Sequence, residues 1–318
     1  MSACGAAGFA QSGRAAAEAP LFPLADMIQE ALPSGPSWTP AVRVVDVGAM
    51  LLDEADDVWR PLVRRGLCES VVGFEPNPEE CDRANARLAR AGPAPAGGGA
   101  AAFRCLPWAL GDGSRGQFRR CSAAMTSSML EPNASLMRRF MQLGEVTQVV
   151  QRSDVTTRRL DDLLAEMPGG RVDFLKLDVQ GYELAVLKGA ERALRDVLVV
   201  HTEVEFVELY ENQPLFAEVD QFMRKAGFVF HRFATLQGRP LKPLFFQSNP
   251  LTPISQQLWG DAVYVRDFWE LQSLSREQLL QCACILHEVY HSYDAVHHIL
   301  RRYDETLAQR YLDQVLSG

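Results

Sequence analysis

An acidic residue closes a buried apolar segment at Asp178, and its position is the one in this chain best suited to chemistry. The preceding residues, Phe174-Leu175-Lys176-Leu177, read as a strand, and Gly181 then turns the chain into a helix that begins near Tyr182. In an open α/β sheet, ligands bind beyond the carboxyl ends of the strands. A carboxylate there can orient or deprotonate a hydroxyl group. The alternative is that Asp178 caps the following helix.

The next predicted strand, residues 197–205, carries further candidates for the same crevice. Alternation along a strand places His201, Glu203 and Glu205 on one face. We therefore expect His201 and Glu203 to join Asp178 as catalytic residues. The alternative for the two glutamates is a salt bridge or a position facing a loop. We expect no resident metal, although Asp178 and Glu203 together have the oxygen ligands that a divalent cation takes.

Two strand–helix units precede this region and predict the elements that position it. Residues 42–47 form a β-branched run that ends at Gly48, and residues 71–74 form a second run that ends on Glu75. Alternating strands and helices predict a parallel sheet with right-handed crossovers. An acid after the second strand of such a unit accepts hydrogen bonds from the ribose hydroxyls of a nucleotide-like cofactor. Glu75 is the candidate for that role.

The loop after the first strand indicates which cofactor to expect. The glycine pattern that binds a pyrophosphate is absent, because Ala49-Met50-Leu51-Leu52 follows Gly48. The acids Asp53 and Glu54 come next and would repel a phosphate at a helix N-terminus. A cationic cofactor without phosphates suits this acidic crevice better than a dinucleotide. S-adenosyl-L-methionine, which carries a sulfonium, a ribose and an adenine, has these properties.

Several short segments, taken in order, resemble the FkbM family of S-adenosylmethionine-dependent methyltransferases. The resemblance extends over roughly residues 42 to 233, and it rests on the order and spacing of the segments together. The matching segments are Val45-Asp46-Val47-Gly48-Ala49, Gly73-Phe74-Glu75-Pro76-Asn77, Trp108-Ala109-Leu110-Gly111-Asp112, Thr126-Ser127-Ser128-Met129, residues 155–163, the region of Asp178, and Glu203-Val204-Glu205-Phe206.

The resemblance implies a fold, an activity and a set of cofactor contacts. The implied fold is a Rossmann-like class I methyltransferase sheet, mostly parallel and of about seven strands. The implied reaction is O-methylation of a hydroxyl on a sugar, a glycan or a small natural product. The implied cofactor-binding residues are Asp46, Gly48, Ala49, Glu75, Pro76, Asn77 and Ala109.

The chain departs from the family pattern in one loop. Where the family usually has a second glycine shortly after the first, this sequence has Met50, Leu51 and Leu52. Leucine does not take up the positive φ that glycine permits, and its side chain occupies space near the cofactor. The alternative function is therefore a non-catalytic member of the fold, with a degenerate cofactor loop, that acts in binding.

Length and composition predict the division of the chain. With 318 residues, 47% of them apolar, the chain can bury one large core. The first segment, residues 1–40, is rich in alanine, glycine and proline and is expected to be a mobile arm. Residues 41–268 form the expected Rossmann-like methyltransferase domain, and residues 269–318 a helical C-terminal appendage. Ser275 and Gln278 have the spacing of a capping box at the start of that appendage.

Charge and hydropathy set expectations for partners and location. A net charge of −8 argues against nucleic acid, which needs a basic face. No apolar run approaches the roughly 18 residues of a membrane span, and no signal peptide is recognisable. Seven scattered cysteines suggest a reducing compartment. We expect a cytoplasmic protein with a small-molecule or glycan acceptor and a homo-oligomer formed through the C-terminal helices.

The appendage contains one sequence motif that is typical of zinc metalloenzymes. His287-Glu288-Val289-Tyr290-His291 matches the H-E-x-x-H arrangement, in which two imidazoles on one helix face bind zinc. His297 has the spacing of a third ligand, but Asp294 stands where that pattern needs a glycine. The expected role is a polar stripe on a packing helix. A zinc metalloenzyme that uses His287 and His291 is the remote alternative.

Overall fold

The computed structural model describes residues 21–31, 41–50, 57–90, 102–246 and 249–317. The arm expected over residues 1–40 therefore lies mostly outside the described residues, as do Leu51, Leu52, Asp53 and Glu54. The described part of the arm contains helix α1 (Leu24–Ala31).

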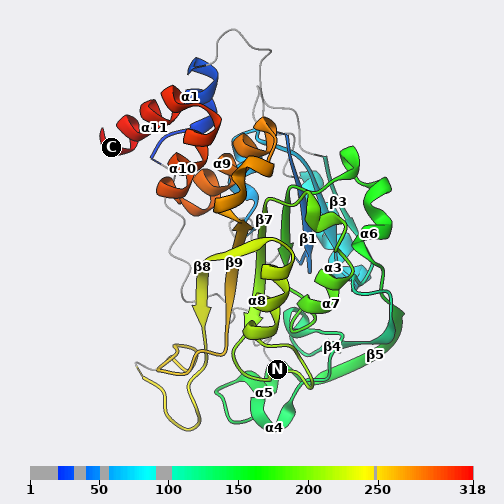
Figure 1. The fold of residues 1–318 in the computed structure, drawn as a ribbon. Coiled ribbons are helices and arrows are strands. Elements are labelled where there is room, and N and C mark those ends of the chain that lie inside the picture. Colours follow the sequence, from blue (N-terminus) through cyan, green and yellow to red (C-terminus); the bar gives the residue numbers. More distant parts are fainter. Residues whose placement is uncertain (1–20, 32–40, 51–56, 91–101, 247–248, 318) are drawn as a thin grey trace.

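A seven-stranded sheet in the order β3-β2-β1-β6-β7-β9-β8 forms the centre of the molecule (Figure 1). The first five of these strands are parallel, and β9 runs antiparallel to both β7 and β8. This arrangement confirms the Rossmann-like class I methyltransferase fold. The strands are β1 (Val42–Val47), β2 (Cys68–Phe74), β3 (Ala102–Leu106), β6 (Phe174–Leu177), β7 (Val199–Glu205), β8 (Phe228–Gln237) and β9 (Trp259–Arg266).

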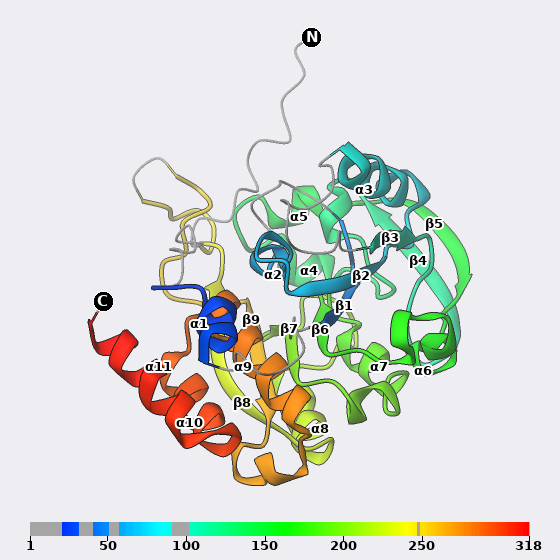
Figure 2. The ribbon, with the colours of Figure 1, turned by 90° about the horizontal axis from the view of Figure 1, so that it is seen from above.

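Helices cover both faces of the sheet (Figure 2). Val42 and Val44 of β1 belong to the apolar cluster on one face, and Val45 and Val47 to the cluster on the other, as strand alternation requires. Strands buried on both faces explain the nearly continuous apolar runs in the sequence. The helices are α2 (Arg60–Arg64), α3 (Pro78–Arg90), α6 (Leu160–Leu163), α7 (Glu183–Lys188), α8 (Phe216–Lys225), α9 (Arg276–Tyr290), α10 (Tyr293–Tyr303) and α11 (Glu305–Ser317).

A smaller layer lies near the carboxyl ends of the parallel strands. Strands β4 (Arg115–Cys121) and β5 (Val149–Thr156) pair as an antiparallel ribbon. The short helices of this layer are η1 (Ala124–Thr126), α4 (Ala134–Met137) and α5 (Leu143–Val146). Phe118 of β4 and Met125 of η1 share a pocket with Val47 at the end of β1. This layer therefore covers the edge of the sheet where ligands bind.

The C-terminal helices pack against the sheet. Residues of α9 such as Leu279 and Ala283 belong to one buried cluster with Val199 and Val263 of the sheet. The predicted capping box is present, since the Ser275 side chain accepts from the Gln278 amide and Gln278 accepts from the Ser275 amide. Because α9 and the sheet share this cluster, the packing does not mark a boundary between the sheet and the C-terminal helices. The three-part domain division therefore stays a prediction.

His287 and His291 are placed as parts of the helix packing. Both ring nitrogens of His287 have partners in the core: Nδ1 lies 2.9 Å from the Tyr311 hydroxyl and Nε2 lies 2.7 Å from the Phe22 carbonyl. His291 follows the end of α9 in a left-handed conformation, with φ of 51°. This geometry favours the packing role over a zinc site. None of the helices in the described ranges is long and apolar enough to cross a membrane.

Replacing Ser275 with alanine removes the side-chain acceptor at the start of α9. We expect Ser275→Ala to lower the free energy of unfolding by about 1 kcal/mol, the usual effect of losing an N-cap. Urea denaturation measures the change. The control Ser275→Asp keeps an acceptor and should retain most of the stability, so an equal loss in both variants would contradict the capping role.

Candidate functional site

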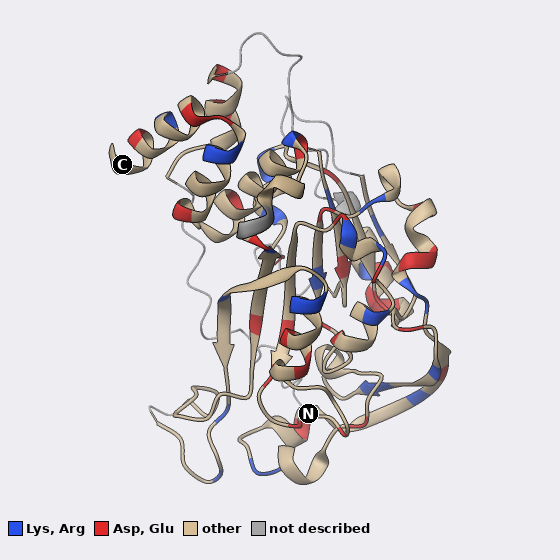
Figure 3. Cartoon of the chain, in the orientation of Figure 1, with Lys and Arg blue, Asp and Glu red and all other residues tan. Residues whose placement is uncertain are grey.

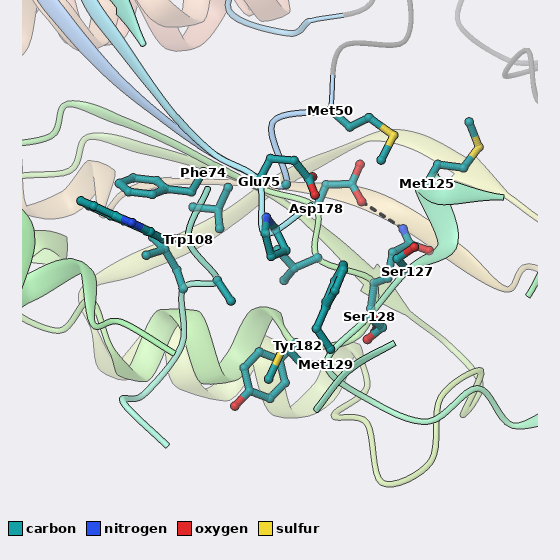
Figure 4. Close-up of a pocket in the computed structure, with 18 of the residues that line it drawn as sticks. Met50, Phe74, Glu75, Trp108, Met125, Ser127, Ser128, Met129, Asp178 and Tyr182 are labelled. Carbon is teal, nitrogen blue, oxygen red and sulfur yellow. Dashed lines mark hydrogen bonds between the residues drawn. The ribbon is translucent and has the colours of Figure 1, made fainter. Parts of the chain in front are cut away.

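A pocket lies at the carboxyl ends of β1, β2 and β6 (Figure 4). The space between its walls, including the solvent in its open mouth, is about 680 Å³. Gly48, Glu75 and Asp178 contribute from the ends of the three strands. Further lining comes from residues 108–110, from Phe118 of β4, and from residues 124–125 and 127–129 in and after η1.

Gly48 lets the loop after β1 touch the end of β6. Its φ is +77°, and a Cβ atom added there would lie 1.8 Å from the carbonyl oxygen of Asp178. No other residue fits this position without moving the backbone. The Asp178 amide also donates to the Val47 carbonyl at 3.0 Å. The position of Asp178 in the pocket is therefore fixed by its backbone as well as by its side chain.

Lys176 supplies a partly buried positive charge beneath the pocket. Its Nζ lies 3.0 Å from Asp46 Oδ1, 3.9 Å from Asp178 Oδ2, and 3.1 Å from the Gly48 carbonyl oxygen. Burial lowers the pKa of this ammonium group, but the charges of Asp46 and Asp178 outweigh burial and raise the pKa above its usual value. Lys176 thus stays charged and orients the carboxylate of Asp178.

Asp46, an expected cofactor residue, lies under the pocket floor. Its side chain is 2% exposed and accepts a 2.8 Å hydrogen bond from Trp59 Nε1 in addition to its ion pair with Lys176. Ala49 is also buried and packs beside Cys81 and Cys105. Neither residue lines the pocket, and their role in binding a cofactor stays a prediction.

Glu75 does line the pocket, and Asn77 orients it. The backbone amide of Asn77 donates to Glu75 Oε1 at 2.8 Å. Burial raises the pKa of Glu75 to about 7, against the opposing effects of that hydrogen bond and of Lys176. Pro76 and Ala109 line the pocket as well. Of the expected cofactor residues, the structure thus brings Gly48, Glu75, Pro76 and Ala109 together around the pocket. Asn77 contacts the pocket through Glu75.

Gln180, which sequence reasoning missed, connects Asp178 to Glu203. Its Nε2 donates to Asp178 Oδ1 at 3.0 Å and to Glu203 Oε2 at 2.7 Å (Figure 4 shows the first of these bonds). Its Oε1 accepts from the Tyr210 hydroxyl at 3.1 Å. Gln180 takes a positive φ of 57°, and its carbonyl accepts a bond from Ser128 Oγ at 2.8 Å. A polar residue two positions after Asp178, in the same turn, was the available signal.

The expected catalytic residues Glu203 and His201 lie outside the pocket lining. Glu203 is linked to Asp178 by two hydrogen bonds, both donated by the side-chain amide of Gln180. The amide of Gln180 stands between the two carboxylates, an arrangement that favours hydrogen bonding over a divalent cation. His201 Nδ1 lies 3.1 Å from the hydroxyl of Tyr290 in α9. His201 therefore belongs to the packing between the sheet and α9.

Glu203 also belongs to a buried group of carboxylates. Ligand oxygens of Glu183, Glu203 and Glu205 lie within 4.8 Å of one another. Burial, followed by repulsion from neighbouring acids, raises the pKa of Glu203 and Glu205 well above the usual value. Burial also raises the pKa of Glu183 to about 7. Protons shared among these acids relieve their repulsion at neutral pH.

Comparison with known proteins gives one match over most of this region. The model of the methyltransferase FkbM domain matches residues 46–230. Among proteins with curated descriptions, none matches the chain significantly.

Solved structures give only distant likenesses. The chain is similar to magnesium protoporphyrin IX methyltransferase from Synechocystis PCC 6803, with 11% identity, a TM-score of 0.35, and coverage of 77% of this chain and 76% of that one. It is also similar to a 16S rRNA (adenine(1408)-N(1))-methyltransferase from Catenulisporales acidiphilia, with 13% identity, a TM-score of 0.34, and coverage of 76% and 91%.

Removing the amide of Gln180 should release both carboxylates that it holds. We expect Gln180→Ala to lower the free energy of unfolding by about 1 to 3 kcal/mol, because buried polar groups lose a partner. Urea denaturation at neutral pH measures the loss. The control Gln117→Ala removes an exposed glutamine whose side chain donates to Asp154 Oδ1 at 3.1 Å, and it should change stability by less than about 0.5 kcal/mol. Equal stability of the two variants would sink the bridging role.

Proposed function

Because this chain belongs to the FkbM methyltransferase family, we propose that it transfers the methyl group of S-adenosylmethionine to a hydroxyl group on a sugar, a glycan or a small natural product. The observation that carries the proposal is the pocket, in which Glu75 and Asp178 meet at the carboxyl ends of three parallel strands. All of the strand ends that form it lie within the residues that match the family.

The residues of the pocket fit the parts of S-adenosylmethionine. Glu75 offers a carboxylate to the ribose hydroxyls, and Asn77 holds that carboxylate in place. Trp108 and Ala109 form an apolar end that suits an adenine ring. Asp178 lies between these residues and the far end of the pocket (Figure 4). When bound, the cofactor would supply an electrophilic methyl group.

Asp178 is our candidate for the residue that acts on the acceptor. Methyl transfer is an in-line displacement: the acceptor oxygen forms a bond to the methyl carbon as the bond from that carbon to sulfur breaks. The hydroxyl proton then needs a base. Gln180 Nε2 orients one oxygen of Asp178, and Lys176 lies 3.9 Å from the other. The side chain of Asp178 is 39% exposed, so a proton taken up there can pass to solvent.

The alternative is a non-catalytic member of the family. Met50 lines the pocket, and this methionine belongs to the loop that departs from the family pattern. Isothermal titration with S-adenosylmethionine and with S-adenosylhomocysteine separates the two functions. Binding of both supports the enzyme, and no binding of either at millimolar concentration contradicts it.

Several expectations about partners and location stay predictions. Acidic and basic residues are interspersed along the described elements (Figure 3), and the net charge of −8 is unfavourable for nucleic acid. We accordingly propose an acceptor other than nucleic acid, a cytoplasmic location, and a homo-oligomer formed through the C-terminal helices.

Glu75→Ala tests the ribose contact. We expect the variant to bind S-adenosylmethionine more weakly by about 1.5 to 3 kcal/mol, the range for hydrogen bonds to a charged group. Isothermal titration near pH 8 measures the difference. Unchanged affinity would remove Glu75 from the ribose site.

The pKa of Glu75 adds a dependence on pH. Ribose hydroxyls donate more strongly to a carboxylate than to a carboxylic acid, and the pKa of Glu75 is raised to about 7. Affinity for S-adenosylhomocysteine should therefore rise from about pH 6 to about pH 8 and then level off. Glu75→Gln keeps the shape without titrating, so the Glu75 contribution to this rise should disappear. The same slope in both proteins would contradict the assignment.

Asp178→Asn tests whether Asp178 is the base that takes the proton of the acceptor hydroxyl. We expect turnover to fall by about 100-fold or more, while affinity for S-adenosylhomocysteine and the melting temperature change little. The measurement is transfer of a labelled methyl group to an accepted substrate at saturating cofactor. Weaker cofactor binding with normal turnover would instead place Asp178 at the cofactor. A large fall in melting temperature with little kinetic effect would favour the helix-cap role.

A further inference from the structure

Three methionines line the pocket, and Met129 lies apart from the other two, beside Tyr182 (Figure 4). Met50 follows β1, Met125 belongs to η1 and Met129 follows η1. Figure 4 shows Met50 and Met125 at the end beyond Asp178, opposite Trp108. Methionine side chains are apolar, polarisable and adaptable, and they make favourable contacts with aromatic rings. The part of the pocket next to Asp178 thus has a deformable apolar wall.

The serines in this part of the pocket are already engaged with the protein. Ser128 Oγ donates to the Gln180 carbonyl at 2.8 Å and accepts from the Leu130 amide at 2.9 Å. Ser127 Oγ accepts from the Cys121 amide at 3.1 Å. Of these two serines, Ser127 is therefore the one better able to donate a hydrogen bond to a ligand, through its hydroxyl group.

Gln180 and Tyr182, two further polar side chains of the lining, also have internal partners. Both ends of the Gln180 amide are bonded, to two carboxylates and to the Tyr210 hydroxyl. The Tyr182 hydroxyl lies 3.2 Å from Ser114 Oγ. With Glu75 assigned to the ribose, Asp178 and Ser127 are the polar groups of the described lining that can best serve an acceptor.

This distribution of polar groups is unfavourable for a sugar. Each hydroxyl of a polyol that is buried without a partner costs about 1 to 3 kcal/mol, and among the described residues of the lining Asp178 and Ser127 are the side chains best placed to pair with such a hydroxyl. An acceptor with a single hydroxyl group meets Asp178 at no such cost, and its apolar surface gains from burial against the methionines.

We propose that the methyl acceptor is a phenol or an alcohol with a largely apolar surface, bound beside Asp178 against Met50 and Met125. This inference rests on the proposed methyltransferase function and narrows its acceptor from three classes to one, a small hydroxylated apolar compound. The single hydroxyl lies at Asp178, and the rest of the acceptor contacts the thioether wall.

Binding of two probes tests the acceptor class. 1-Naphthol and methyl α-D-glucopyranoside are titrated into the protein saturated with S-adenosylhomocysteine and, separately, into the free protein. We expect 1-naphthol to bind at least about 10-fold more tightly than the glucoside, a difference of about 1.4 kcal/mol. Tighter binding of the glucoside, or no binding of 1-naphthol in either titration, overturns the proposal. A failure of S-adenosylhomocysteine to bind counts against the methyltransferase function, whereas the free-protein titration still measures the preference between the probes.

Substitution of Met125 tests where in the pocket the acceptor binds. We expect Met125→Asn to weaken 1-naphthol binding by about 5-fold or more, because a polar group replaces a polarisable apolar one. The matched control Met125→Leu keeps the wall apolar and should bind 1-naphthol within about 2-fold of the original protein. Affinity for S-adenosylhomocysteine should be the same in all three proteins. A parallel loss of S-adenosylhomocysteine affinity, or unchanged 1-naphthol binding by Met125→Asn, would assign this wall to something other than the acceptor.

Discussion

The site depends on the direct contact between Gly48 and the backbone of Asp178. A side chain at residue 48 would overlap the Asp178 carbonyl, so the ends of β1 and β6 can meet only through glycine. The parallel register brings β2 to the same edge, since Asp46 pairs with both Gly73 and Lys176. Glu75 then follows β2 and reaches the pocket. Two carboxylates from strands far apart in the sequence thereby face one cavity.

The acids around this edge fall into two groups that differ in how their charge is balanced. Asp46 and Asp178 share the partly buried ammonium of Lys176. Glu203 and Glu205 lie in a buried cluster of acids, and burial raises their pKa values. Asp178 thus faces the pocket beside a positive charge, while the acids behind Gln180 bind protons more readily than ordinary carboxylates do. The hydrogen bonds of Gln180 link the two groups.

The sequence predicted the fold and the strand ends well, because both depend on patterns that extend over many residues. Apolar runs that stop at Gly48, Glu75 and Asp178 placed these residues at one edge, where the structure has the pocket. The neighbours of single side chains were harder to foresee. Alternation assigned His201 to a face of β7, but it could not show that Tyr290 of α9 covers that face. The hydrogen bonds of Gln180 depend on the conformation of one turn, and no periodic pattern in the sequence encodes that conformation.

A crystal structure of the protein with S-adenosylhomocysteine would test the central claim most directly, namely that this pocket binds the cofactor. The account predicts the ribose hydroxyls within hydrogen-bond distance of Glu75, the adenine beside Trp108 and Ala109, and the sulfur close to Asp178. A ligand bound elsewhere, or a pocket that stays empty after a soak at millimolar concentration, would contradict it.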